Sequence, residues 1–235
     1  MSQPQSAKQR LNNTSPKAHH RVILLHGLLM PSTVMQPLAR KLKARGFAAS
    51  CYGYPTRKKR VDALADSLAA HIRHLPEAPH LVGHSMGGVV ILRTLQRHPE
   101  LAVQRVVALG SPFQGSSCAH ALSKKSWGRW LLGESYPQGL DGQLSSSQGG
   151  QKACVPKGRE VGVVAGHWPY SFTRLVIPGV PEEGDGVVGL NETRLAGAQW
   201  CSLNTNHTAI LGYPHTAGVV AHFLTHGIFP TDLET

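Results

Sequence analysis

The sequence contains no long apolar run, and this excludes a membrane-spanning helix. Its longest uninterrupted apolar stretches, such as residues 22–25 and 89–92, are far shorter than the roughly 20 residues that cross a bilayer. Residues 1–20 are polar and lack the apolar core of a secretory signal, so we expect a flexible N-terminal arm and a cytoplasmic location. Because 41% of the residues are hydrophobic, the chain can still form a packed core, which excludes a disordered protein.

Cysteines are few and widely spaced. The chain has four, Cys51, Cys118, Cys154 and Cys201, with no C-x-x-C pair among them. In a chain without a secretory signal, this usage favours reduced thiols over a disulfide framework. A single disulfide between Cys154 and Cys201 is the alternative.

Acidic residues are also scarce. The chain has 13 Asp and Glu against 24 Lys and Arg, which gives a formal net charge of +11. Its basic run, Arg-Lys-Lys-Arg at residues 57–60, has no aromatic residues interleaved, and no nucleic-acid-binding motif is visible, so we expect no nucleic-acid partner. We interpret the run as a solvated loop ahead of a helix, and peripheral contact with an anionic membrane is the alternative.

What the sequence does contain is an alternation of short apolar runs and helical patterns. We expect strands at 22–25, 47–52, 79–82, 103–109, 160–165 and 198–203, and helices at 32–45, 61–75, 89–98 and 217–227. This alternation is typical of a parallel sheet with helices on both faces. We therefore predict an α/β fold with a mostly parallel central sheet, built as a single domain over residues 21–230.

A glycine-flanked serine lies between the third expected strand and its helix. The segment Gly83-His84-Ser85-Met86-Gly87 has the G-x-S-x-G form of a nucleophile elbow, in which the serine oxygen stands clear of the sheet at a sharp strand-to-helix turn. The glycines allow strand and helix to approach closely, and the N-terminus of the helix favours developing negative charge. The pattern predicts that Ser85 is a nucleophile. A tight turn with an exposed serine is the alternative.

A serine nucleophile needs a base, and the base needs a third group to orient it. One known order along the chain is nucleophile, acid and then histidine. Asp185, in a glycine-rich loop, and His207, after the last expected strand, follow Ser85 in that order. The alternatives for the acid are Glu182 and Glu183, and His215 is the best alternative for the base.

Two backbone N–H groups can hold the oxyanion that forms when Ser85 attacks a carbonyl. One comes from Leu28, where the first buried strand runs into His26-Gly27, and the other from Met86 at the elbow. We expect His26 to brace its loop through hydrogen bonds.

Residues 117–158 interrupt the alternation and are too long for an ordinary connection. We predict a cap or lid over the site, with Trp127, Trp130 and Leu131 on one face of a short helix. These three side chains either pack the cap or form an apolar wall for an acyl chain. Leu29 and Phe113 are further candidates for substrate contact.

Taken in order, these segments resemble the bacterial lipases and esterases of the α/β-hydrolase fold. The resemblance rests on His26-Gly27, the elbow, the segment Gly-Ser-Pro-Phe-Gln-Gly-Ser at residues 110–116, the loop at 185–188 and Asn206-His207-Thr208. It spans about residues 21–227. The resemblance implies an α/β-hydrolase fold, triad roles for Ser85, Asp185 and His207, and oxyanion roles for Leu28 and Met86.

The sequence departs from those lipases in two respects. Phe113 stands where they carry a histidine, and the calcium site that many of them hold near the histidine loop lacks a second acidic ligand, because Asn204 and Asn206 are neutral. We therefore expect no metal and no cofactor.

The function expected from these observations is a serine hydrolase that cleaves small-molecule or lipid acyl esters. An acyltransferase or thioesterase would use the same triad, because the triad does not encode the acceptor or the leaving group. A non-catalytic binding protein of the same fold is the third alternative.

Overall fold

The computed structural model describes residues 20–141, 153–168 and 179–231. All statements below concern these ranges. The predicted N-terminal arm lies outside them except for its last residue, and so does the part of the predicted cap at residues 142–152.

Six strands form one parallel sheet, which confirms the predicted fold class. They are β1 (Arg21–Leu25), β2 (Ala48–Tyr52), β3 (His80–His84), β4 (Val106–Leu109), β5 (Val161–Gly166) and β6 (Gln199–Leu203). Their order across the sheet is β2-β1-β3-β4-β5-β6, and each neighbouring pair is parallel. Because parallel strands all end at the same edge, this order brings the loops after β1, β3, β4, β5 and β6 together.

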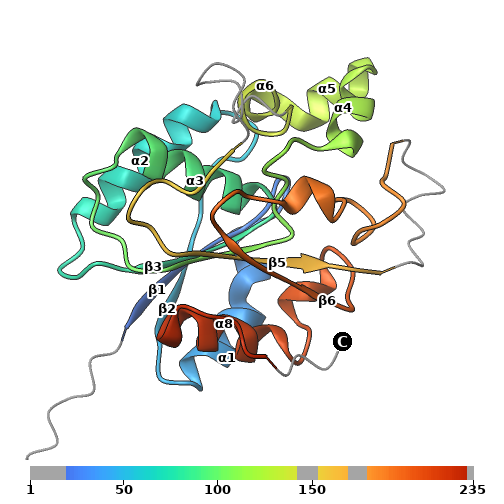
Figure 1. Cartoon of the computed structure of the whole chain (residues 1–235). Coiled ribbons are helices and arrows are strands. Elements are labelled where there is room, and N and C mark those ends of the chain that lie inside the picture. The colour runs from blue at the N-terminus through green and yellow to red at the C-terminus, as the bar shows by residue number, and fades with distance from the viewer. Residues whose placement is uncertain (1–19, 142–152, 169–178, 232–235) are drawn as a thin grey trace, which may run out of the picture.

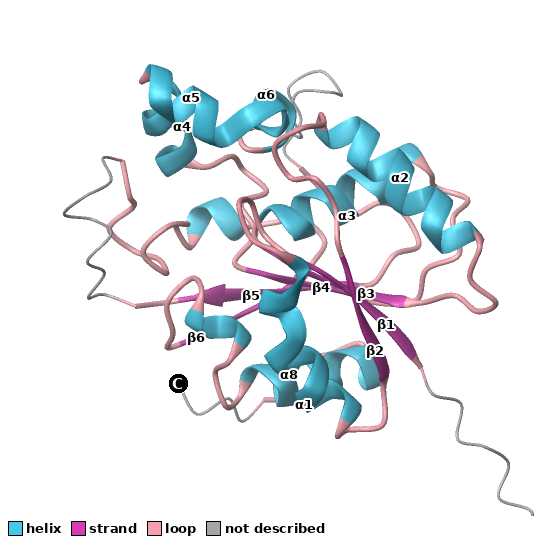
Figure 2. Ribbon diagram, turned by 180° about the vertical axis from the view of Figure 1, so that it is seen from behind, coloured by secondary structure: helices cyan, strands magenta, loops and turns pink. Residues whose placement is uncertain are grey.

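Helices cover both faces of the sheet (Figure 1). The helices on one face are α2 (Val61–Arg73) and α3 (Met86–Arg97), and those on the other are α1 (Gln36–Lys43) and α8 (Thr216–His226). The view from behind shows the same three layers (Figure 2). Strands buried on both faces are nearly continuous apolar runs, and this is what residues 22–25 predicted.

The two faces of β1 show how the sheet divides the core. Ile23 and Leu25 pack into the cluster beneath α2 and α3, whereas Val22 and Leu24 pack into the cluster beneath α1 and α8. Successive side chains of a strand point to opposite faces, so one short segment contributes to both clusters. Because β1 is packed on both faces and pairs with β3, the loop that follows β1 has a fixed position relative to the loop that follows β3.

The first helix differs from the prediction at its start. A 3-10 turn over Ser32–Met35 precedes α1, and the N-cap residue of that turn is Pro31, with no side-chain capping bond. Ser32 is therefore not the N-cap that its residue type suggests. Pro37 falls at the start of the α-helical segment, where its missing N–H has no cost.

The described part of the predicted cap contains three short helices. They are α4 (Ser117–Ser123), α5 (Ser126–Leu132) and α6 (Tyr136–Gly139), with a 3-10 turn over Gly133–Ser135 between the last two. They lie on the side of the sheet that carries α2 and α3 (Figure 2). The α4 helix begins after Ser116, whose hydroxyl oxygen accepts a hydrogen bond from the N–H of Ala119.

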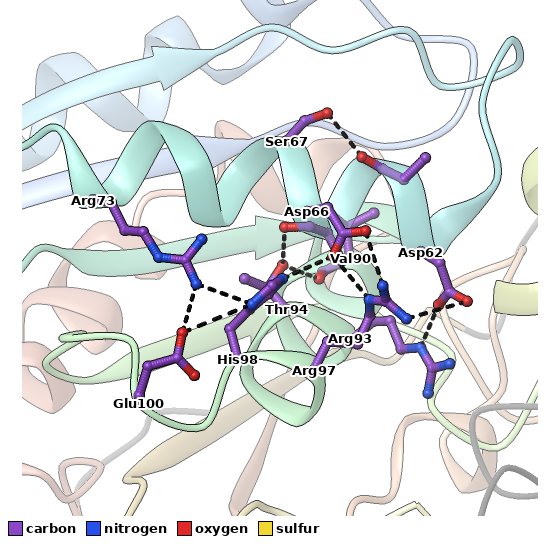
Figure 3. Close-up of polar contacts among 12 residues, drawn as sticks. Asp62, Asp66, Ser67, Arg73, Val90, Arg93, Thr94, Arg97, His98 and Glu100 are labelled. Atoms are coloured by element: carbon purple, nitrogen blue, oxygen red, sulfur yellow. Dashed lines mark hydrogen bonds and ion pairs between the residues drawn. The ribbon is translucent and has the colours of Figure 1, made fainter.

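An ionic network joins α2 to α3 along their solvent side (Figure 3). Arg93 Nε donates to Asp62 at 2.6 Å, Arg97 pairs with Asp66 at 2.9 Å, and His98 Nε2 lies 2.8 Å from Asp66. The hydrogen bond from Arg93 lowers the pKa of Asp62, and the one from Arg97 lowers that of Asp66. Exposed ion pairs contribute little to stability. The apolar contacts beneath them therefore hold α3 against α2, and the ionic network helps to set the register of the two helices.

Candidate active site

Ser85 lies at the sharp turn between β3 and α3. Its backbone has φ 53° and ψ −121°, a strained conformation for a residue with a Cβ, and its N–H donates to the carbonyl of Leu109 at 2.8 Å. The turn lifts the side chain away from the carboxyl end of the sheet. This is the geometry that the G-x-S-x-G segment predicts.

The glycines of the elbow allow a close approach of strand and helix. A Cβ on Gly83 would lie 2.4 Å from the nitrogen of Gly88, and one on Gly87 would lie 2.5 Å from the carbonyl oxygen of Leu25. Both distances are far below van der Waals contact with backbone that cannot move away. The elbow therefore requires glycine at both positions.

Asp185 and His207 form a buried pair beside the elbow. His207 Nδ1 lies 2.6 Å from Asp185 Oδ2, and Asp185 Oδ1 accepts the N–H groups of Val187 at 3.0 Å and Val188 at 2.8 Å. The backbone N–H of His207 also donates to the carbonyl of Asp185 at 3.0 Å. The carboxylate is thus fixed by its own loop, and its free oxygen orients the imidazole.

The alternatives to this pair lie elsewhere. Glu182 and Glu183 are exposed, whereas only 2% of Asp185 is exposed. His215 is exposed at the start of α8, with its ring 5.4 Å from that of Tyr213. The structure therefore brings Asp185, and not the two glutamates, against His207.

His84 also takes part in this arrangement, which nothing in the sequence indicated beyond its place in the elbow motif. It is fully buried, and its Nε2 lies 2.8 Å from the backbone carbonyl oxygen of His207, so Nε2–H donates. Burial and, second, the neighbouring His207 lower the pKa of His84 to about 3. His84 is therefore neutral, its Nδ1 has no partner within the described residues, and it connects the nucleophile turn to the histidine loop.

A cavity of about 170 Å³ opens onto Ser85 and His207. Its lining residues are Gly27, Leu28, Met30, His84, Ser85, Pro112, Ser116, Cys118, Ala119, Leu122, Leu132, Leu140, Val187, Val188 and His207. No hydrogen bond joins the side chains of Ser85 and His207, both of which are described. In serine hydrolases the hydrogen bond between nucleophile and base is often long without substrate and shortens when substrate binds.

Of the two predicted oxyanion donors, Leu28 lines the cavity and Met86 directly follows Ser85. Met86 is the first residue of α3, so its N–H has no acceptor within the helix. Leu29, next to Leu28, has φ 62°, and its N–H donates to Thr56 Oγ1 at 3.2 Å. The loop after β1 is thus held in a strained shape beside the elbow.

His26 braces that loop, as its position predicted. Its Nδ1 lies 3.0 Å from the carbonyl oxygen of Gly27, and its ring stacks on that of Tyr54 at 4.5 Å. The hydroxyl of Tyr54 donates to the carbonyl of His26 at 2.5 Å. Burial lowers the pKa of His26, so it stays neutral in this position.

None of the five predicted substrate-contact residues lines the cavity. They are Leu29, Phe113, Trp127, Trp130 and Leu131. Phe113 is 1% exposed and belongs to the core beneath α2 and α3, whereas Trp127 and Trp130 are 56% and 69% exposed. The apolar wall that the sequence analysis assigned to the two tryptophans is formed by other residues.

That wall comes from the inner faces of the cap helices, at Leu122, Leu132 and Leu140. The reason lies in Gly128, where a Cβ would lie 2.0 Å from the carbonyl oxygen of Leu122, so α5 packs against α4 through this glycine. Leu132 is four residues further along and shares the inner face with Gly128. The two tryptophans then point outward.

The described residues contain no group of three or more His, Cys, Asp or Glu side chains that could hold a metal ion. All four cysteines are free. No helix in the described ranges combines the length and the apolar character needed to cross a bilayer.

Comparisons with known proteins agree with this fold. A model of the alpha/beta hydrolase family matches residues 22–187. Comparison with curated proteins gave no match. Among solved structures, the chain is similar to the mature form of the Bacillus licheniformis lipase BlEst2, with a TM-score of 0.75 and 22% identity over 90% of this chain and 94% of that one.

Two further structures have the same fold at lower similarity. Aspergillus fumigatus lipase B has a TM-score of 0.63 and 15% identity over 91% of this chain and 54% of its own. The carboxylesterase CesB from Bacillus subtilis has a TM-score of 0.56 and 19% identity over 91% of this chain and 86% of its own. At these identities the likeness shows the fold alone, whereas the family model covers more than half of the sequence. The chain therefore belongs to the alpha/beta hydrolase family.

Proposed function

We propose that this protein is a serine hydrolase that cleaves carboxylic acyl esters. The observation that carries the proposal is the meeting of two features in one cavity. A buried Asp185–His207 pair and a serine on a strained elbow both face the same small apolar space. Each feature alone occurs for structural reasons, but together they supply a nucleophile, a base and a group that orients the base.

Acylation uses the pair as follows. His207 takes the proton of Ser85 as the Oγ atom attacks the ester carbonyl carbon, and Asp185 stabilises the imidazolium that forms. The N–H groups of Leu28 and Met86 donate to the oxyanion, and one such donor is worth about 3 kcal/mol of transition-state stabilisation. The carbon–oxygen bond of the ester then breaks, and His207 gives its proton to the leaving alcohol.

Deacylation repeats these steps with water in place of Ser85. His207 takes a proton from the water, whose oxygen attacks the acyl carbon, and the bond to Ser85 Oγ breaks as that oxygen regains its proton from His207. The products are the carboxylic acid and the free enzyme. A thiol or a second alcohol in place of water would give the acyltransfer alternative.

The cavity favours acyl groups of short to medium length. Its volume of about 170 Å³ is below the roughly 300–1,000 Å³ of pockets for drug-sized ligands, and four of its lining residues are leucines. The neighbours with the same fold include a lipase and a carboxylesterase, which is in keeping with an ester substrate.

Two measurements test the proposal together. A fluorophosphonate probe is expected to label wild-type protein and to leave the Ser85→Ala variant unlabelled. A series of p-nitrophenyl esters from acetate to palmitate is expected to give its highest kcat/KM at about four to eight carbons, because the cavity is small. Folded wild-type protein that neither reacts with the probe nor hydrolyses any ester would refute the proposal and favour a binding protein.

A further inference from the structure

The outer surface of the cap carries the two most exposed large hydrophobic side chains of the described residues. Trp127 is 56% and Trp130 is 69% exposed, and both lie on α5. Water-exposed indoles so close together are costly, and such patches mark surfaces that bind something. Because they point away from the cavity, they have no part in the ester chemistry.

Basic side chains surround these indoles. The guanidinium of Arg57 lies 4.1 Å from the ring centre of Trp130 and donates to its carbonyl oxygen at 2.6 Å. The ammonium of Lys125 lies 5.8 Å from the ring of Trp127. These contacts join the basic run at residues 57–60 to α5, so that the run and the outer side of α4 and α5 form one continuous face, which we call the cap surface.

The cap surface has a strong excess of positive charge. Residues 57–60 and 117–141 contain seven Lys and Arg against two acidic residues, a net charge of +5 within a total of +11. Lys58, Lys59, Lys124 and Lys125 are all exposed. A partner for this face must therefore be anionic and must also accept indole rings.

We propose that the cap surface docks the protein onto an anionic phospholipid bilayer. This inference rests on the proposed ester hydrolase function, because it names where the acyl substrate comes from. Tryptophan favours the boundary between headgroups and acyl chains, and Lys and Arg are attracted to anionic lipid at about 1 kcal/mol each. A bilayer offers both environments at the same depth.

The cavity lies directly behind this face, which favours lipid over nucleic acid as the partner. Leu122 of α4 and Leu132 of α5 line the cavity, while Trp127 and Trp130 stand on the outer side of α5. The same two short helices therefore separate the reactive serine from the docked membrane. The distance that an acyl chain must cover from the bilayer to the cavity is therefore only about the thickness of these helices. A polynucleotide, in contrast, would find few polar partners in the apolar cavity.

Vesicle co-sedimentation of the full chain tests the proposal. We expect binding to vesicles of phosphatidylglycerol and phosphatidylcholine, little binding to phosphatidylcholine alone, and weaker binding as salt rises. Lys58→Gln with Lys59→Gln should weaken partitioning about 25-fold, which is fivefold for each cation at about 1 kcal/mol. Trp127→Ala with Trp130→Ala should weaken it at least tenfold.

Matched controls lie on the opposite face of the sheet. Lys43→Gln with Arg45→Gln removes the same charge from exposed positions at the end of α1, and Ile228→Ala removes an apolar side chain that is 53% exposed. Both should bind vesicles as the wild type does. Equal losses in the control and cap variants would show a general charge effect and would overturn the proposal.

The two proposals fail in different ways. Ser85→Ala should still bind vesicles although it hydrolyses nothing, and the tryptophan variant should still hydrolyse a soluble butyrate ester. No binding by folded, ester-hydrolysing wild type would overturn docking alone. Binding of a single-stranded oligonucleotide through the same indoles, without binding to vesicles, would also overturn it and identify a nucleic-acid surface. If the tryptophan variant does not fold, the loop variant at residues 58 and 59 decides the question.

Discussion

Replacing Asp185 by asparagine tests the most specific feature of the site, which is that its two carboxylate oxygens have different hydrogen-bond partners. Oδ1 accepts two backbone N–H groups, from Val187 at 3.0 Å and Val188 at 2.8 Å. Oδ2 faces His207 Nδ1 at 2.6 Å. Asparagine has the same shape but only one acceptor oxygen, so the surroundings decide where that oxygen goes.

The two backbone donors keep the amide oxygen at the Oδ1 position. The amide NH₂ group of Asp185→Asn must then face His207 Nδ1, which can only accept from it. The proton of the imidazole moves to Nε2, the atom that has to take the proton of Ser85. We expect kcat to fall about 10⁴-fold, equivalent to about 5.4 kcal/mol of activation free energy, while KM stays within about threefold.

The assay is turnover of p-nitrophenyl butyrate, with thermal unfolding as the check on structure. The melting temperature should stay close to that of the wild type, because the backbone hydrogen bonds to the side chain remain. Glu183→Gln is the matched control, since its side chain is exposed, and it should keep wild-type activity. Asp185→Asn with at least a tenth of wild-type activity would refute the assignment, and a large loss in Glu183→Gln would transfer the role to that residue.

Four further results are expected. His84→Ala removes the donor to the His207 carbonyl, so kcat should fall about 10- to 100-fold for roughly 1–3 kcal/mol with KM little changed, and His84→Gln should restore part of the loss; a change in KM alone would contradict a positioning role. Gly83→Ala places a Cβ 2.4 Å from a backbone nitrogen of α3 and should lower the melting temperature and abolish probe labelling, and a wild-type melting curve would exclude this close approach. Leu132→Trp should raise the activity ratio of acetate to octanoate esters at least tenfold, whereas an unchanged ratio would place the acyl chain elsewhere. Burial lowers the pKa of His80 from 6.5 to about 4, so as the pH falls the unfolded chain takes up this proton before the folded protein does. The contribution of His80 to the free energy of unfolding is complete above about pH 6.5 and is lost below it, by about 1.4 kcal/mol per pH unit. The free energy of unfolding, measured with urea between about pH 7 and 5, should therefore change less with pH in His80→Asn than in the wild type.

The fold was predictable because its signals are local. Each buried strand is a short apolar run, and each covering helix has an apolar stripe, as at residues 22–25 and 61–73. Parallel order follows from the alternation of the two patterns. The errors lie at element ends, where β4 begins at Val106 and not at residue 103, because ladder pairing and not apolarity decides where a strand starts.

Residues of the candidate site were predictable only where the neighbouring sequence indicates their role. Ser85 is marked by its flanking glycines, and Asp185 and His207 by their loops and their order. His84 was missed because its contact is with the backbone of a residue 123 positions away, which no local pattern encodes. The cavity walls were missed for a related reason, since Gly128 sets which side of α5 faces inward through its approach to Leu122 of another helix.

Backbone strain and the proposed chemistry coincide in this fold. In the described residues, only Leu29 and Ser85 combine a side chain with positive φ. Each adjoins a predicted oxyanion donor, Leu28 before the first and Met86 after the second. A residue held in such a conformation costs about 1–3 kcal/mol, and it persists only where its surroundings fix it. Here the fixing bonds are those from the N–H of Leu29 to Thr56 and from the N–H of Ser85 to the carbonyl that ends β4. The strain is therefore concentrated where the proposed mechanism needs two N–H groups to point at one oxygen, and the parallel sheet supplies the rigidity that maintains it.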